Sequence, residues 1–165
     1  MKMQKITPFL WFDKQAEEAM KFYVSIFTDA RIVSIKRYPD GPLEGPWQGM
    51  EGKVLTAEFE LAGQRFFALD GGPVFKPTGA VSFYIECETQ DEVDHYWSKL
   101  SAGGDPAMQQ CGWLMDKFGF SWQVVPKILG ELMNDPDPVK SDRVLQAMLK
   151  MKKLDIAGLK QAYEG

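Results

Sequence analysis

The segment 111–126 constrains the fold more than any other stretch, because its pattern predicts two strands folded back on each other. Tryptophan and phenylalanine side chains give the two arms bulk and strand propensity. Gly119 can adopt the positive φ that a tight turn needs, and Pro126 ends the second arm because it cannot donate to a ladder. The segment therefore predicts a β-hairpin with one polar residue, Gln123, at the centre of its second strand.

The predicted order of elements occurs twice along the chain. In each half, a strand is followed by a helix with an apolar stripe and then by further strands. The second helix opens with Thr89 and Glu92, which have the spacing of a capping box. The pattern predicts an α+β protein built from two βαβββ modules. The expected strands are 6–12, 31–38, 55–61, 65–69, 80–87, 107–110 and the two arms of the hairpin.

The two modules are followed by a helical extension. We expect one domain over 1–165, with module one at 1–73, a linker at 74–79, module two at 80–126 and a helical tail at 127–165. The loop 39–52 is rich in glycine and proline and carries Trp47 near its centre. Loops of this length are uncommon unless they are functional or disordered. Trp47 is therefore part of either a lid over a pocket or a flexible connector.

Charge and cysteine content exclude several classes of partner. The chain of 165 residues has a net charge of −4, so electrostatics favours neither nucleic acid nor an anionic membrane. No apolar run approaches the roughly 20 residues of a membrane helix. Cys87 and Cys111 form no disulfide framework and are expected to be small buried hydrophobes. These features predict a cytoplasmic protein with no nucleic-acid or membrane partner.

Three groups of segments resemble a known family and together cover nearly the whole chain. The first group lies at the start of the chain and comprises 6–12, 16–19 and 22–23. The second is the central segment 111–126. The third lies in the tail and comprises 132–137 and 147–156. They resemble the PhnB-like branch of the vicinal oxygen chelate superfamily, which includes glyoxalase I, ring-cleaving dioxygenases and bleomycin-binding proteins. That branch also carries the description 3-demethylubiquinone 3-methyltransferase. The resemblance implies two modules that form a cupped, mixed or antiparallel sheet around a pocket, and a homodimer.

The resemblance also implies where metal-dependent relatives place their ligands. The four corresponding positions here are Pro8, Ala68, Ser82 and Gln123. A hard divalent cation takes carboxylate or imidazole ligands, which this set does not supply. Asp70 offers one carboxylate near the second position, and the chain's single histidine, His95, is expected on the surface of the second helix. We therefore expect no metal ion and no cofactor.

A small-molecule pocket is the expected site. In the strand 80–87, the apolar set would pack on the helices and leave the polar set on the concave side. The fourth strand would send Phe66, Ala68 and Asp70 inward. In the alternative, Ser82, Tyr84 and Gln123 satisfy one another in a filled core. The candidate pocket residues are Pro8, Leu10, Trp47, Phe66, Ala68, Asp70, Ser82, Tyr84, Glu86, Trp113 and Gln123.

Three functions are compatible with the sequence. The preferred one is metal-free binding of a small molecule, which needs no catalytic group. The second is an enzyme acting on a small aromatic or quinone-like substrate, as the family's description implies, with acid–base chemistry by Asp70 or Glu86. Methyl transfer is disfavoured, because the first strand runs into Asp13-Lys14-Gln15 and not into the glycine-rich turn that binds S-adenosylmethionine. The third is a dimeric structural or interaction protein.

Overall fold

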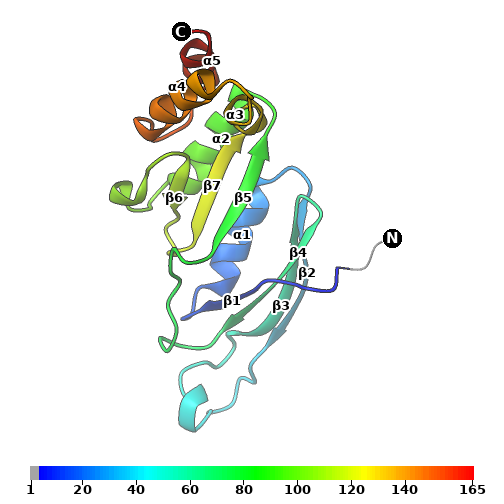
Figure 1. Ribbon diagram of the computed structural model, residues 1–165. Helices are drawn as coiled ribbons and strands as arrows, with labels where there is room; N and C mark the ends of the chain where they lie inside the picture. The colour runs from blue at the N-terminus through cyan, green and yellow to red at the C-terminus, as the bar shows by residue number, and fades with distance from the viewer. Residues whose placement is uncertain (1–3) are drawn as a thin grey trace. The chain divides into compact units, whose positions relative to one another are not determined.

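The computed structural model describes residues 4–165, which divide into two compact units, 4–77 and 78–165. The first unit contains β1 (Phe9–Phe12), α1 (Ala16–Ile26), β2 (Ala30–Arg37), β3 (Val54–Leu61) and β4 (Gln64–Asp70). Its sheet has the order β1-β4-β3-β2, with β1 parallel to β4 and the other pairs antiparallel (Figure 1). The predicted βαβββ plan of module one is therefore confirmed.

The core of the first unit lies between α1 and one face of its sheet. Tyr23 of α1 stacks on Phe59 of β3 with ring centroids 6.4 Å apart, and Phe59 stacks on Phe66 of β4 at 5.2 Å. All three side chains are at most 5% exposed. This stack identifies the α1 side of the sheet, because residues at even spacing along a strand share its face. The hairpin between β3 and β4 turns at Ala62 and Gly63, which both have positive φ.

The second unit contains β5 (Ser82–Cys87), α2 (Gln90–Ser101), β6 (Trp113–Met115) and β7 (Ser121–Pro126). Its sheet has the order β5-β7-β6, with β5 parallel and β6 antiparallel to β7, and α2 covers one face (Figure 1). The predicted hairpin is confirmed, and Gly119 in its turn has a φ of 90°. On the α2 side, Phe83 contacts Trp122 with ring centroids 5.0 Å apart.

The strand expected at 107–110 is wrong. Residues Pro106–Met108 form a 3₁₀ turn, in which the Asp105 carboxylate accepts a hydrogen bond from the Ala107 amide. Proline at the start of that turn has no amide to donate to a ladder. The backbone that follows pairs elsewhere, because the amides of Cys111 and Gly112 donate to the carbonyls of Met151 and Lys152 in the tail. The described part of module two therefore has two strands after its helix.

The tail forms three helices, α3 (Lys127–Met133), α4 (Pro138–Leu149) and α5 (Ile156–Glu164). The helical tail is therefore as predicted, and within it the break at Asp135-Pro136-Asp137 is followed directly by α4 at Pro138. Asp137 accepts hydrogen bonds from the amides of Val139 and Lys140, and Pro138 suits the first helical position. The tail packs around one apolar cluster, made of Val125, Leu129, Val144, Leu154 and Leu159.

The loop 39–52 folds on itself around Met50, which is 3% exposed. A short 3₁₀ turn, Gly45–Trp47, lies within it, and the Glu51 carboxylate accepts a hydrogen bond from the Leu43 amide at 2.9 Å. That hydrogen bond lowers the pKa of Glu51. Trp47 itself is 55% exposed. Among the helices of residues 4–165, none combines the length and apolar character needed to cross a bilayer.

The predicted capping box opens α2. The Thr89 hydroxyl accepts a hydrogen bond from the Glu92 amide at 3.2 Å, while the Glu92 carboxylate reaches back to the amide of Glu88. We expect Thr89→Ala to lower the free energy of unfolding by about 1 kcal/mol, because one helix-end amide loses its partner. Urea denaturation measures the change. Thr89→Ser keeps the hydroxyl and should remain near wild type, so an equal loss in both variants would contradict the capping role.

Candidate functional site

Three residues form a row across the second sheet, on the face opposite α2. Tyr84 of β5 lies beside Gln123 of β7, and Gln123 lies beside Trp113 of β6. Their strand neighbours Phe83, Trp122 and Leu114 face α2. Because successive side chains along a strand point to opposite faces, Tyr84, Gln123 and Trp113 point away from α2. Tyr84 is 56% exposed and Trp113 is 37% exposed. We call Tyr84, Gln123 and Trp113 the aromatic row.

Hydrogen-bonding groups accompany the aromatic row. The Gln123 side-chain amide donates to the Ser82 hydroxyl oxygen at 2.9 Å. Gln123 keeps its carbonyl oxygen as an acceptor, and Ser82 keeps its hydroxyl proton as a donor. Partial burial raises the pKa of the Tyr84 hydroxyl, and the Glu86 carboxylate raises it further. Tyr84 is therefore a neutral phenol at neutral pH and can both donate and accept a hydrogen bond.

Five of the predicted pocket residues thus share one sheet face. They are Ser82, Tyr84, Glu86, Trp113 and Gln123, and their common face agrees with the predicted alternation of β5 and β7. Ser82 and Gln123 do satisfy each other, as the filled-core alternative proposed. Tyr84 does not belong to a filled core, because more than half of its surface is exposed.

The first sheet contradicts the predicted orientation of β4. Phe66, Ala68 and Asp70 are at most 5% exposed and lie on the α1 side, where Phe66 stacks on Phe59. Leu10 pairs with Ala68 and is also buried. The prediction was wrong because β4 is apolar on both faces, so periodicity alone could not identify the side that meets the helix.

Asp70 is a structural carboxylate and not an open-face group. One carboxylate oxygen accepts a hydrogen bond from the Ala16 amide and the other from the Val54 amide, both at 2.9 Å. Aspartate is a residue type that favours the N-cap, so Asp13 before α1 is the cap that the sequence pattern predicts. Asp13 is instead exposed, and the side chain of the N-cap residue Gln15 makes no hydrogen bond to the helix end. Asp70 supplies that acceptor from β4. Acid–base chemistry by Asp70, left open by the sequence, has no support in this placement.

The opposite face of the first sheet carries aromatic residues that the sequence analysis missed. Phe9 of β1 pairs with Phe67 of β4, and their ring centroids are 5.5 Å apart. Trp11 makes an edge contact with Phe75 at 5.0 Å, and its indole N–H donates to the Gly72 carbonyl. The sequence carried a signal for these residues. In β1 the aromatic residues Phe9 and Trp11 alternate with Leu10 and Phe12, which are buried.

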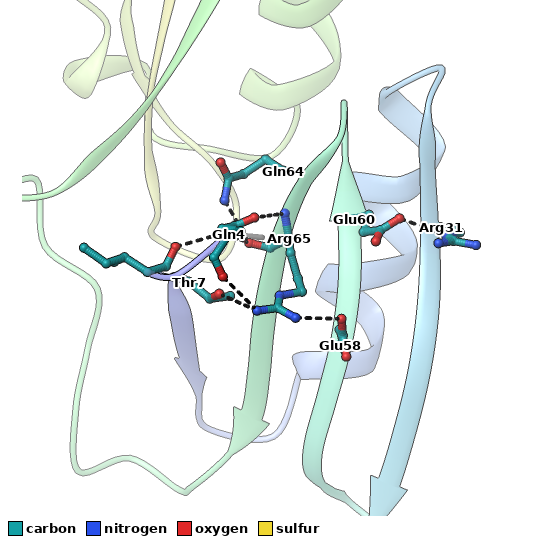
Figure 2. A network of polar contacts seen from close by, with 8 residues as sticks. Gln4, Thr7, Arg31, Glu58, Glu60, Gln64 and Arg65 are labelled. Carbon is teal, nitrogen blue, oxygen red and sulfur yellow. Dashed lines mark hydrogen bonds and ion pairs between the residues drawn. The ribbon is translucent and has the colours of Figure 1, made fainter. Parts of the chain in front are cut away.

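Beside these aromatic residues, polar and charged side chains form hydrogen bonds and ion pairs with one another (Figure 2). The Arg65 guanidinium donates to the Gln4 carbonyl at 3.2 Å and the Thr7 hydroxyl at 3.3 Å, and lies 3.8 Å from Glu58. The Gln4 side-chain amide in turn pairs with the Arg65 backbone. Arg31 and Glu60 form a separate ion pair at 2.8 Å. The network holds residues 4–7 on β4, and its charges are balanced.

The remaining two candidates belong to the first unit. Pro8 is half-buried, and its carbonyl accepts a hydrogen bond from the Phe67 amide at 2.9 Å. Trp47 lies on the exposed 3₁₀ turn of the loop 39–52.

The donor set does not fit the metal ion that the fold family implies. Ala68 is buried against α1, and Gln123 is hydrogen-bonded to Ser82. His95 lies on α2 with its ring against Tyr96. Within residues 4–165, no three His, Cys, Asp or Glu side chains gather in a way that could hold a metal ion.

Comparisons with known proteins place this geometry in a family. A family model described as 3-demethylubiquinone-9 3-methyltransferase matches residues 4–125. A PhnB protein from Bacillus cereus, named provisionally as such a methyltransferase, is 44% identical, with a TM-score of 0.66; the match covers 74% of this chain and 99% of that chain. The match of the family model thus ends before the tail.

More distant structures share the fold alone. Protein PA1353 from Pseudomonas aeruginosa is 20% identical with a TM-score of 0.59, over 75% of this chain and 98% of that chain. A FosX fosfomycin resistance protein from Listeria monocytogenes, complexed with Mn(II) and 1S,2S-dihydroxypropylphosphonic acid, is 16% identical with a TM-score of 0.53, over 79% and 99%. A comparison with curated proteins gave no match. The chain belongs to the PhnB-like family described as 3-demethylubiquinone-9 3-methyltransferase.

Proposed function

We propose that this protein binds a small, planar, partly aromatic molecule at the aromatic row, without a metal ion. The observation that carries the proposal is the register of Tyr84, Gln123 and Trp113 on one open sheet face. Neighbouring strands lie about 4.8 Å apart, so the two aromatic residues stand about 10 Å apart on either side of Gln123. Aromatic rings stack or meet edge to face at centroid distances of about 5 Å. A planar group between the two rings can therefore contact both.

The polar groups below that space suit an oriented ligand. Gln123 offers a carbonyl acceptor, Ser82 a hydroxyl donor and Tyr84 a phenol, all on the same face. Small-molecule sites combine apolar or aromatic walls with a few placed polar groups. The first sheet is a weaker candidate, because Arg31 already pairs with Glu60 and Arg65 lies 3.8 Å from Glu58.

Substitution of the row tests the binding proposal. We expect quinoline, and a ubiquinone-type headgroup such as 2,3-dimethoxy-5-methyl-1,4-benzoquinone, to bind the wild type in calorimetry. Tyr84→Ala should weaken binding about tenfold, because stacking on one base-like ring contributes roughly 1 kcal/mol or more. The matched control is Tyr38→Phe in the first unit, which should bind as the wild type does. Equal affinity of wild type and Tyr84→Ala would contradict a site at this row.

Elemental analysis tests the metal-free part of the proposal. We expect the purified protein to hold no stoichiometric divalent ion, since the side chains at the family's ligand positions are poor donors for one. Binding of the probes should also persist after dialysis against a chelator. One tightly held ion per chain, or loss of probe binding with the chelator, would overturn this part.

An enzyme acting on a quinone-like substrate is the second candidate, and the family description favours it. S-adenosylmethionine does not fit the residues present. β1 passes through Asp13-Lys14-Gln15 directly into α1, and its one sheet neighbour is β4. A glycine-rich turn that would cradle the cofactor is missing there. A thermal-shift titration separates the candidates, because a ligand of the folded state must raise the melting temperature. Stabilisation by S-adenosylmethionine would favour the methyltransferase.

A further inference from the structure

Charge distinguishes the face that carries the aromatic row. Its residues in β5, β6 and β7 include one carboxylate and no basic side chain; they are Ser82, Tyr84, Glu86, Trp113, Met115, Ser121, Gln123 and Val125. Glu86 lies two residues beyond Tyr84 on the same strand, which places it about 7 Å along the face. The face thus presents a negative group near Tyr84, on the strand next but one to Trp113.

Glu86 has no charged partner across the sheet. Its cross-strand partner is Val125, an apolar residue that is 6% exposed and packs in the cluster of the tail. Lys127, which follows β7, interacts electrostatically with Glu86 but donates its hydrogen bond to the Glu88 carboxylate at 3.3 Å. Two carboxylates therefore share one ammonium group, and the net charge at this end of the sheet is negative.

We propose that the ligand of the aromatic row is an organic cation, either a planar aromatic cation or a quaternary ammonium group. This inference rests on the proposed function and names the ligand class. Cations are attracted to the faces of tryptophan and tyrosine at up to about 6 Å from the ring centroid. Trp113 and Tyr84 supply two such rings, and Glu86 supplies the counter-charge on the same face. An anionic ligand would meet the same carboxylate as a repulsion.

Three probes of one shape test this inference. N-methylquinolinium is a cation, quinoline is neutral at pH 7.5, and quinoline-3-carboxylate is an anion. We expect the cation to bind the wild type about tenfold more tightly than quinoline, and the anion to bind most weakly. Raising the ionic strength should reduce the difference between the cation and quinoline, because salt screens exposed charges.

Glu86→Gln removes the charge and keeps the shape of the side chain. It should abolish most of the preference for N-methylquinolinium and leave the affinity for quinoline within about twofold. Glu86 is exposed, so the variant should fold as the wild type does. The matched control is Glu164→Gln, which removes an exposed carboxylate from the end of α5 and should keep the preference.

The outcomes separate this inference from the proposed function. If the wild type binds all three probes equally and Tyr84→Ala binds none of them, the cation preference is overturned and the binding site is supported. A preference for the carboxylate probe, or a cation preference that survives Glu86→Gln, would also overturn it. Failure of every probe to bind the wild type would overturn the proposed function together with this inference.

Discussion

Asp70→Ala should lower the free energy of unfolding by about 3 to 5 kcal/mol, the largest effect we expect from a single substitution in the first unit. Each carboxylate oxygen accepts a backbone amide, one from Ala16 and one from Val54. The side chain is 1% exposed, so water does not replace it at either amide. A buried donor without a partner costs about 1 to 3 kcal/mol, and here two donors lose theirs.

The matched control for this prediction is Asp13→Ala. Asp13 is the cap that the sequence predicts, but it is exposed, so its removal should change stability by less than about 0.5 kcal/mol. Urea denaturation gives the free energies, and hydrogen exchange of residues 4–77 shows whether protection is lost around α1 and β3. A larger loss in Asp13→Ala than in Asp70→Ala would contradict the assignment of the cap.

Asp70 also predicts a pH dependence of defined sign. Burial raises its pKa above the ordinary value of 3.8, and the hydrogen bonds from Ala16 and Val54 oppose that shift. The folded state then binds the Asp70 proton more tightly than the unfolded state does. Its contribution to the free energy of unfolding is therefore greatest below pH 3.8 and falls as pH rises through the folded pKa. We expect the free energy of unfolding of the wild type to exceed that of Asp70→Asn by an amount that shrinks as pH rises from 3.8 through the folded pKa. A difference that grows with pH would contradict a raised pKa of Asp70.

Asp116→Ala should lower the free energy of unfolding of the second unit by about 3 to 5 kcal/mol. One oxygen of Asp116 accepts the amides of Phe118 and Phe120, at 2.8 and 3.1 Å, and the other accepts the Trp122 indole N–H at 2.9 Å. Asp116 and Trp122 are each 2% exposed. The substitution leaves two partly buried amides of the hairpin turn and the buried Trp122 indole without acceptors, at about 1 to 3 kcal/mol for each buried donor.

The matched control is Asp105→Ala, which removes an exposed carboxylate that accepts a single amide in the same unit. We expect it to cost at most about 1 kcal/mol. Hydrogen exchange of residues 113–126 should show lost protection in Asp116→Ala alone. Native protection of the hairpin in that variant would mean that Gly119 and the strand pairs hold the turn without the carboxylate.

Most secondary structure could be predicted from residues close together in the chain. The capping box at Thr89, the turn at Gly119 and the tail helices depend on local hydrogen bonds and apolar spacing, and each was found. The strand expected at 107–110 failed because Pro106 begins a 3₁₀ turn, in which the amides of Met108 and Gln109 donate to the carbonyls of Asp105 and Pro106. The homodimer stays a prediction.

The candidate site, too, could be predicted from the sequence only in part. The row of Tyr84, Gln123 and Trp113 follows from alternation, because β5 and β7 each have one plainly apolar side. In β4 both sides are apolar, so the assignment of Phe66 and Ala68 to an open face was wrong.

The sequence by itself determined the elements of this protein, their order and its family, because helix period, strand alternation and turn residues act over a few positions. The tertiary structure decided which side of the first sheet is core and what Asp70 does. The Asp70 carboxylate and the Ala16 amide are 54 residues apart in the chain. Their hydrogen bond exists because β4 pairs with β1, and no local pattern records that pairing.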